Sequence, residues 1–359
     1  MKLFKSLLVA PATLGLLAPM AATANEVTIS DFAPSEQLAI TNSRVDGLEA
    51  RMNNIEAGSF SETTSAAFSA DFIIGAIDGT SNEKVTAGYS YQIDLSTSFT
   101  GEDSFDVSID AGNEAFAEID ANSTSDALTI DGIAYTFPLG DKTTVFVGDK
   151  MDGSTLYNTA CVYGGVTDTL DDCGNANSAM AAGAGTAAGA SFDIGNGFTA
   201  ALGYTGNGTS GLMTKEGYDT YGGQLTYTAD SYGASVTYAN VEASTDVTYW
   251  GLNGYWTPDE TGTAVPSISV GYEMGDPASG ADTTQWFVGL QWDEMGPGVL
   301  GAAIGSNGAI ADGAAEYAMY EAYYSYPIND SVTITPIVYI EEESGADDTG
   351  IIVKTSFSF

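Results

Sequence analysis

The sequence predicts an all-β protein: a transmembrane antiparallel β-barrel of 16 strands, preceded by a short N-terminal coiled-coil helix. Three observations support this prediction: strand-like alternation through most of the chain, an export signal at its start, and a composition poor in charge. The alternation is clearest at the end of the chain, where Ile351, Val353, Thr355, Phe357 and Phe359 share one face. A period of two with one apolar face indicates a β-strand.

The final aromatic residues of this strand carry a second signal. A strand that closes the chain on a terminal Phe resembles the signal by which the barrel-assembly machinery inserts bacterial outer-membrane barrels. We therefore assign Phe357 and Phe359 to a barrel-insertion signal. An ordinary exposed edge strand of a soluble protein would show the same alternation, so the remaining evidence has to separate the two.

The N-terminus predicts export. Residues 1–5 are basic, residues 7–17 are apolar but too short to span a bilayer, and Ala22-Thr23-Ala24 is a small-x-small cleavage site. We interpret residues 1–24 as a removed signal peptide. No later stretch approaches the length of a transmembrane helix, so the exported chain is either soluble or a membrane β-barrel.

Composition favours the barrel. Charged residues make up 16% of the chain, which also has 43 Gly and 20 Tyr, whereas soluble domains carry about 25% charge. Removal of Lys2 and Lys5 with the signal takes the net charge from −39 to −41. A wall that faces lipid on one side and water on the other suits this composition. The chain has no basic patch, which argues against nucleic acid as a partner.

The chain offers little for catalysis. It contains no His, which excludes Ser-His and Cys-His nucleophiles and His-bound metals. The stretch Gly183–Gly189 is one residue off a dinucleotide fingerprint and lies among Ala and Ser, so we give it no weight. We therefore expect no enzyme activity, and we assign no catalytic residue, no metal site and no cofactor.

Between the signal and the barrel, residues 25–58 read as a periplasmic arm and a helix. Apolar positions in residues 37–57 repeat with a 3-4-3-4 spacing, the seam of a coiled coil: Leu38, Thr41, Val45, Leu48, Met52 and Ile55. Three heptads are marginal alone, so this oligomerisation helix needs a partner or a tether. The alternative is a single amphipathic helix lying against the barrel mouth.

From residue 59 to 359 the period is two, and we count sixteen segments, an even number as a closed single-chain bacterial barrel requires. Their predicted spans are 62–77, 84–99, 103–111, 126–137, 141–149, 187–195, 198–206, 218–229, 232–241, 246–257, 265–274, 283–293, 298–305, 315–326, 331–341 and 349–359. Aromatic residues gather near strand ends, as in interface girdles: Tyr89, Tyr91, Trp250, Trp256, Trp286, Trp292, Tyr324 and Tyr326.

The links alternate between long and short, as external loops and periplasmic turns do. The exception is Pro258–Ala264, which is too long for a tight turn. The longest link, Lys150–Thr186, contains both cysteines, Cys161 and Cys173. In an oxidising compartment they are expected to form one disulfide, with two buried free thiols as the alternative. A loop of this length without its own secondary structure is usually functional.

Three segments together resemble a known family: the signal Leu7-Leu-Val-Ala-Pro-Ala, the helix Val45-Asp-Gly-Leu-Glu-Ala-Arg-Met-Asn-Asn-Ile-Glu-Ala57, and the first strand Phe60-Ser-Glu-Thr-Thr-Ser. They look like a cyanobacterial porin of the carbohydrate-selective porin family. The rest of the barrel matches by pattern alone. Members of that family are generally trimeric outer-membrane diffusion channels for ions and small solutes. Their usual N-terminal surface-layer-homology domain is expected to be absent here, because about a dozen residues separate the signal from the helix.

In general porins, which the barrel resembles, the third external loop folds inward and narrows the channel. The resemblance implies a pore-constriction loop in which Asp152, Asp168, Asp171 and Asp172 face the pore. The alternative is a solvated external flap held by the disulfide.

We therefore expect a passive outer-membrane porin, with its N-terminal helix in the periplasm. The expected partners are outer-membrane lipid, the barrel-assembly machinery, two further copies in a homotrimer, and small hydrophilic solutes, including ions and sugars. Beyond residue 58 the only basic residues are five lysines, which predicts cation preference. The alternatives are a structural or adhesive outer-membrane barrel with a plugged lumen, and an exported soluble β-sandwich.

Overall fold

The computed structural model describes residues 64–79, 84–113, 116–119, 121–174, 185–206, 211–214, 217–259 and 264–359, with Asp172 and Gly174 as backbone alone. The predicted signal peptide and the predicted helix 37–57 lie outside these residues. Met1–Gly58 and Ser59–Phe359 form separate units, and the second is described by itself. Among the described residues, no helix has the length and hydropathy to cross a membrane.

The second unit consists almost entirely of strands. In chain order they are β1 Thr64–Asp78, β2 Thr86–Thr97, β3 Ser104–Gly112, β4 Thr129–Pro138, β5 Thr143–Met151, β6 Gly185–Gly195, β7 Phe198–Gly206, β8 Asp219–Thr228, β9 Tyr232–Val241, β10 Val247–Trp256, β11 Ser267–Pro277, β12 Thr283–Met295, β13 Gly298–Ser306, β14 Ile310–Ala311, β15 Ala318–Asn329, β16 Val332–Glu341 and β17 Asp348–Ser358. A short 3₁₀ turn, η2, spans Asp171–Gly174.

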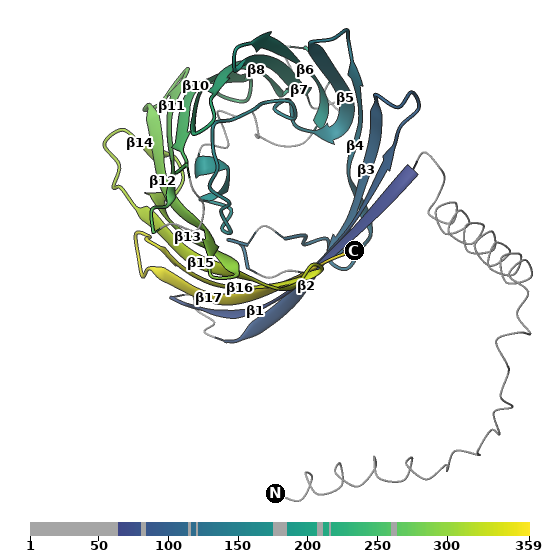
Figure 1. The fold of residues 1–359 in the computed structure, drawn as a ribbon. Coiled ribbons are helices and arrows are strands. Elements are labelled where there is room, and N and C mark those ends of the chain that lie inside the picture. Colours follow the sequence, from purple (N-terminus) through teal and green to yellow (C-terminus); the bar gives the residue numbers. More distant parts are fainter. Residues whose placement is uncertain are drawn as a thin grey trace, which may run out of the picture. The chain divides into compact units, whose positions relative to one another are not determined.

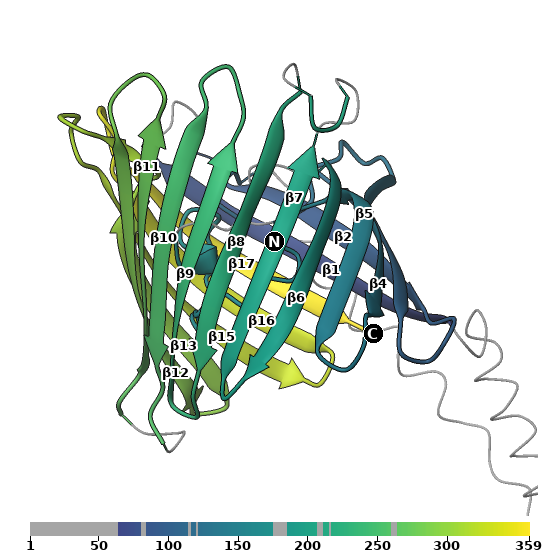
Figure 2. The same cartoon turned by 90° about the horizontal axis from the view of Figure 1, so that it is seen from above.

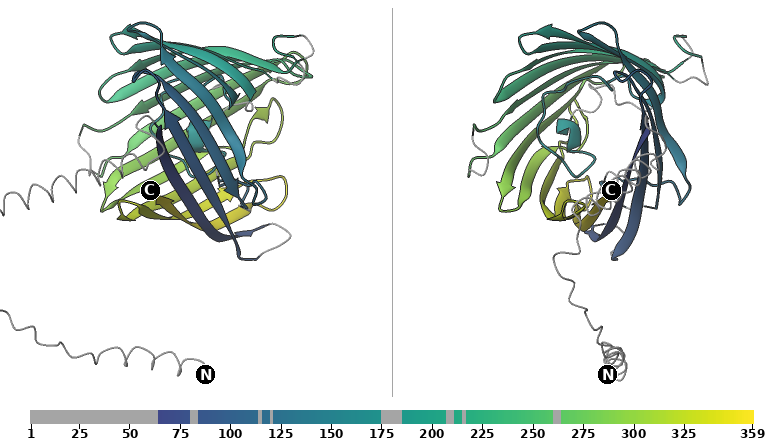
Figure 3. Two further views of the ribbon diagram at one scale, coloured as in Figure 1. Left: turned by 90° about the vertical axis from the view of Figure 1, so that its right-hand side faces the viewer. Right: turned by 45° about the vertical axis from the view of Figure 1, so that its right-hand side comes forward.

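The strands form one closed antiparallel barrel (Figure 1). Each long strand pairs with the next, and β1 pairs with β17 from Ser69↔Ser358 to Asp78↔Thr349. Closure leaves no exposed strand edge, which is the condition for a sheet to stand in lipid. The predicted sixteen-stranded barrel is confirmed, and the strands are tilted to the barrel axis (Figures 2 and 3).

Strand β14 is an addition that the sequence analysis did not predict. Its two residues, Ile310 and Ala311, pair with Thr284 and Thr283 of β12. They fold the link between β13 and β15 back onto the barrel wall. Two residues are too few to show a period, so alternation could not reveal this strand.

The connections divide between the two ends of the barrel (Figure 2). We call the end where β1 begins and β17 ends the turn end. Its connections have six residues or fewer, except for 257–266, which the sequence also marked as too long for a tight turn. We call the opposite end the loop end. It carries the longer connections, above all 113–128 and 152–184.

The outer face of the turn end carries a belt of aromatic rings. Neighbouring rings contact one another around the barrel: Phe99 with Phe105 and Tyr135, Tyr135 with Phe137, Phe198 with Tyr227, Tyr227 with Tyr232, and Tyr324 with Tyr326. Trp256 and Tyr326 remain 42% and 45% exposed. Amphipathic rings at one level of a barrel are typical of a membrane–water interface.

The seam between first and last strands is also aromatic. The ring of Phe359 stacks on Phe68 with centroids 5.8 Å apart, and Phe357 meets Phe72 edge-on at 5.9 Å. The backbones of Phe68 and Phe359 exchange two hydrogen bonds of 2.9 and 3.0 Å. The two residues assigned to the insertion signal therefore lie on the barrel's closing seam; their role in insertion stays a prediction.

Candidate functional site

The link after β5 runs inside the ring of strands (Figure 1). We call residues 152–174 the luminal loop; the structure does not describe residues 175–184. The backbone N–H groups of this loop donate to side chains that project inward from successive strands. Gly153 donates to Thr205 of β7 at 2.6 Å, and Asn158 donates to Gln224 of β8 at 2.8 Å.

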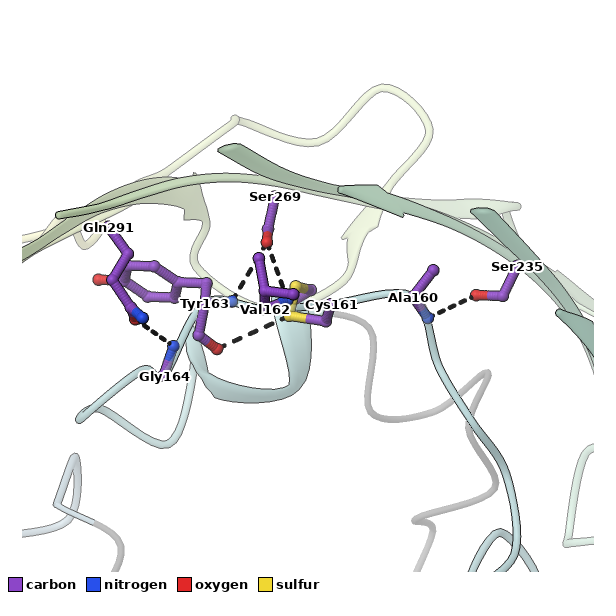
Figure 4. Close-up of a disulfide and its surroundings, with 9 residues drawn as sticks. Ala160, Cys161, Val162, Tyr163, Gly164, Ser235, Ser269 and Gln291 are labelled. Atoms are coloured by element: carbon purple, nitrogen blue, oxygen red, sulfur yellow. Dashed lines mark hydrogen bonds between the residues drawn. A yellow bond between two sulfur atoms is a disulfide. The ribbon is translucent and has the colours of Figure 1, made fainter. Parts of the chain in front are cut away.

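The same pattern continues along the wall (Figure 4). Ala160 donates to Ser235 of β9 at 3.0 Å. Val162 donates to Ser269 of β11 at 3.1 Å, and Gly164 donates to Gln291 of β12 at 2.9 Å. The loop lacks a sheet or helix partner, so these side chains satisfy backbone groups that burial would otherwise leave unpaired.

Glu321 of β15 anchors the far part of the luminal loop. The side chain is 4% exposed. Its carboxylate accepts hydrogen bonds from the Tyr163 hydroxyl, the Thr167 hydroxyl and the Thr167 amide, the last at 3.0 Å, with Val166 more distant at 3.4 Å. Burial and the nearby carboxylate raise the pKa of Tyr163, so this tyrosine stays a donor. A buried carboxylate with this many donors is well satisfied.

A disulfide between Cys161 and Cys173 closes the loop on itself, with a Cα–Cα separation of 6.2 Å (Figure 4). Beside it lies a hydrophobic cluster inside the barrel. The cluster joins Leu170 and Tyr163 of the loop to inward side chains of the wall: Ile73, Phe287, Met319, Ile337, Tyr339 and Ile352. Apolar contact and backbone hydrogen bonding together fix the loop against this side of the barrel.

The link between β3 and β4 also reaches the lumen. Phe116 and Ile119 are 1% and 3% exposed and belong to the same cluster. Glu118 lies between them; its carbonyl accepts from Asp168 N at 3.1 Å, and its carboxylate accepts from Thr169 at 2.9 Å. Burial, with added repulsion from Glu341 and Asp168, raises the pKa of Glu118.

The lumen face of the remaining wall follows from strand register. Paired residues of an antiparallel sheet share a face, and so do residues two apart on one strand. Glu321 touches the luminal loop, so its partner Tyr339 faces the lumen, as does Gly350, the partner of Tyr339. Gly350 pairs with Ile77 of β1. The same face of β1 therefore holds Asp71.

The register then carries this face to β2 and β3. Asp71 pairs with Ser90, which lies on the same face as Asp94. Asp94 pairs with Ser108, and Asp106 and Asp110 lie two residues to either side of Ser108. The β1–β3 wall thus presents four carboxylates to the lumen. We call Asp71, Asp94, Asp106 and Asp110 the acidic wall.

Hydroxyl and amide groups hold three of these carboxylates, Asp94, Asp106 and Asp110, in place. Ser108 and Gln92 donate to Asp94 at 2.7 and 2.9 Å. Ser104 donates to Asp106 at 2.6 Å, and Thr129 donates to Asp110 at 2.8 Å. Every donor is neutral, so the negative charge of these carboxylates is positioned without being cancelled.

Cations are few in the part of the chain that the structure describes. Lys84 and Lys142 lie in connections between strands. Lys150 lies at the loop end of β5 and donates to the carbonyl of Ile130. Lys354 lies within β17 on the lumen face, paired with Ile73 and Thr335.

The predicted constriction residues do not gather at one point. Asp152 begins the luminal loop, where Gly153 contacts β7. Asp168 is exposed and follows Thr167, which is bound to β15. Asp171 and the backbone of Asp172 lie in η2. The structure brings Asp168 beside Glu118. The sequence did not identify Glu118, Glu321 or the acidic wall as functional residues. Alternation could have identified the acidic wall, because it fixes which side chains share a face.

Comparisons with known proteins place the fold. No protein-family model matches the chain, and no curated protein matches it. Among solved structures, Pseudomonas putida OprB at high pH is similar with a TM-score of 0.66 at 9% identity, covering 86% of this chain and 97% of that one. The anion-selective porin of Comamonas acidovorans has a TM-score of 0.60 at 12% identity, covering 83% and 99%.

A Rhodobacter blastica porin mutant has a TM-score of 0.51 at 15% identity, covering 82% of this chain and all of that one. The chain therefore has the barrel fold of bacterial outer-membrane porins. These identities establish the fold alone.

Proposed function

We propose that this protein is an outer-membrane porin, a passive diffusion channel for ions and small hydrophilic solutes that prefers cations. The observation that carries the proposal is the acidic wall, which sets four carboxylates on the lumen face, with Lys354 of β17 on the same face. A pore lined by fixed carboxylates concentrates cations and repels anions. The name of the Comamonas neighbour states the opposite preference for that protein.

Burial favours a channel over a plugged barrel. Under the luminal loop, the side chains of Thr237, Ser269 and Glu273 are each 1% exposed. Of the acidic wall, Asp110 is 6% exposed, whereas Asp71, Asp94 and Asp106 are only half-buried. Water that reaches these carboxylates gives hydrated ions a path beside the luminal loop. In this arrangement the loop narrows the lumen mainly from the side of β7–β15, where its hydrogen bonds to the wall lie.

A planar-bilayer recording tests the proposal. The full-length refolded protein should form steady channels, and a KCl gradient should give a reversal potential of the sign expected for cation flow. The preference should weaken as salt rises, because screening shortens the reach of the carboxylates. Absence of conductance would favour the plugged, structural barrel. Anion preference at low salt would contradict the selectivity. Sugar passage is a separate measurement, by swelling of protein-loaded liposomes.

The porin proposal includes a location and an assembly. The aromatic belt and the short connections suit the periplasmic interface of an outer membrane, with the loop end outside. We further propose that residues 37–57 form a helix that joins three copies of the chain into a trimer through a coiled coil. Deletion of residues 37–57 should lower the melting temperature of the trimer on semi-native gels and leave the barrel folded, because strand hydrogen bonds close within each chain. An unchanged trimer melting temperature would count against this role of the helix.

A further inference from the structure

Two glycines on the lumen face lie directly beneath the luminal loop. Gly203 of β7 is two residues from Thr205, and Gly271 of β11 is two residues from Ser269. Each glycine therefore shares a face with a side chain that binds the loop. Neither glycine has a positive φ angle, so the backbone conformation at these positions is one that other residues could adopt.

The main chain of the luminal loop occupies the space that a side chain would take at both positions. A Cβ atom added to Gly203 would overlap the carbonyl oxygen of Gly153. One added to Gly271 would overlap the carbonyl oxygen of Cys173. Backbone atoms cannot turn aside as the end of a flexible side chain can. Glycine inside a strand weakens it and often marks a place where another backbone approaches closely.

A third glycine lies beneath a side chain of the loop. A Cβ atom at Gly289 of β12 would stand 2.6 Å from Cγ of Tyr163 and 2.6 Å from Cζ of Phe287. The Tyr163 hydroxyl donates to Glu321, and its ring packs against Phe287 and Tyr323 with centroids 5.4 and 6.1 Å away. These contacts hold the ring flat against the bare backbone of the wall.

The wall is the stiffer of the two partners. Strand β7 is paired along its length with β6 and β8, and β11 is paired with β10 and β12. The loop at Gly153 is attached through its amide, which donates to Thr205. A methyl group at Gly203 or Gly271 should therefore displace the loop rather than the strand. An ordinary van der Waals contact requires a displacement of about 1 Å toward the lumen.

We propose that Gly203, Gly271 and Gly289 are positioning residues that hold the luminal loop close to the wall and thereby set the width of the lumen. Their missing side chains leave more room between the loop and the acidic wall. The inference rests on the channel function proposed above and deepens it, because these glycines then determine the largest solute that passes.

Single-channel recording of the full-length protein tests this role. Gly203→Ala and Gly271→Ala should each lower conductance at high salt by about 1.5- to 2-fold, because the lumen narrows while its carboxylates are screened. At low salt the cation preference should not fall, since ions then pass nearer the acidic wall. A loop that had come loose from the wall would give larger or noisier conductance instead, and that result would overturn the proposal.

Gly254→Ala is the matched control. Gly254 lies within β10 on the outward face, as its position relative to Thr248 and Asp276 shows. An added Cβ there meets the Gly233 carbonyl oxygen at 3.5 Å and Val270 Cγ2 at 3.8 Å, which are ordinary contacts. This variant should conduct like the wild type, and an equal loss in it would contradict the proposal. Heat-modifiability on gels reports folding.

Hydrogen exchange separates failure of the glycine role from failure of the channel. Gly203→Ala should speed exchange of the Gly153 amide by about tenfold or more, because its hydrogen bond to Thr205 is lost, and Gly254→Ala should not. Unchanged exchange in Gly203→Ala would overturn the positioning role, whether or not the protein conducts.

The two measurements together decide each case. Absence of conductance in the wild type would contradict the porin proposal, and exchange would still decide whether the glycines position the loop. Faster exchange with unchanged conductance, in a wild type that conducts, would overturn their role in width. If Gly203→Ala fails to fold, Gly271→Ala decides, with exchange measured at the Val162 amide that donates to Ser269.

Discussion

Two walls of the same barrel are built from similar strands and differ in how their inward side chains are used. On the wall from β7 to β15, inward Thr, Ser, Gln and Glu side chains bind the amides of the luminal loop and are buried; Ser269 is 1% exposed and Glu321 is 4% exposed. On the wall from β1 to β3, comparable hydroxyls bind carboxylates instead, and Asp94 and Asp106 stay half-buried. One wall positions a loop, and the other positions charge.

This difference separates two properties of the lumen, its width and its electrostatic potential. We expect the loop-bearing wall to control the width of the lumen, because moving the loop would change the cross-section. We expect the acidic wall to set the electrostatic potential, because the hydrogen bonds described above to its carboxylates come from neutral donors. The predictions below test whether width and potential can be changed independently.

The largest expected effect comes from the acidic wall. Asp94→Asn, Asp106→Asn and Asp110→Asn together should remove most of the cation preference and leave conductance noise unchanged. A unit charge about 4 Å from an ion contributes about 1 kcal/mol in a water-like dielectric, a roughly fivefold bias per carboxylate. The reversal potential in a KCl gradient measures the change. Asp276→Asn, on the outward face of β11, is the matched control; an equal effect there would contradict the assignment.

The second effect concerns Glu321. Glu321→Ala leaves the Tyr163 hydroxyl and the Thr167 amide buried without their acceptor, at about 1–3 kcal/mol each. The far part of the luminal loop should move, so single-channel conductance should become larger or noisier. Glu321→Gln keeps one acceptor oxygen and should fall between Ala and wild type. Ser325→Ala on the same strand should behave like wild type. Unchanged conductance in Glu321→Ala would mean that the loop does not set the width.

The disulfide should matter less than Glu321. Replacing Cys161 and Cys173 by Ser removes a link across 12 residues, worth roughly 3 kcal/mol of local ordering. Hydrogen bonds to the wall remain before Cys161 and between the two cysteines, so the barrel should stay folded and conductance should become modestly noisier. Reduction of the wild-type protein should reproduce the change. A loss of cation preference without a change in noise would assign the loop to potential rather than width.

The smallest effect should be a pH dependence. The raised pKa of Glu118 lies above the unfolded value of about 4.3. As pH falls, Glu118 therefore takes up its proton before ordinary carboxylates do, and the cation preference should show an early partial loss. The contribution of Glu118 to folding stability follows the protonated form. It is present at low pH and is lost as pH rises from the pKa of Glu118 in the unfolded chain to its pKa in the folded protein. Glu118→Gln should remove the early step in an acid titration of the reversal potential. An identical titration curve would show that Glu118 does not face the ion path.

Alternation alone predicted most of the barrel. The predicted spans of β7 and β9 coincide with the observed ones, because lipid on one face and water on the other impose a strict period of two. The largest shifts at a strand start are three residues, at β4, expected from residue 126 and observed from Thr129, and at β15, expected from residue 315 and observed from Ala318. Ser125 and Asp126 adopt positive φ angles of 55° and 65°, which belong to a turn rather than to a strand.

The site was less accessible from sequence. The length and cysteines of the 150–186 link identified a special loop, and the structure gives it a disulfide and a path inside the barrel. The partners of the loop, such as Ser235, Ser269 and Gln291, are unremarkable on their own strands. They meet the loop at one level because of the stagger between neighbouring strands, which is a property of the whole barrel. Glu118 was missed for a related reason, since its loop showed no period.

From Gly153 to Gly164 the luminal loop is bound to the wall mainly through its main chain, and this has a practical consequence for engineering. The wall side chains accept hydrogen bonds from backbone amides, which every residue except proline provides. The inward side chains of β7–β15 therefore determine most of the path of the loop. Side chains on the uncovered side of the loop, such as Asp168, can then be exchanged without redesigning that path. A library of substitutions there, with the wall left intact, would give a family of nanopore sensors that share one backbone and differ in the chemistry presented to the analyte.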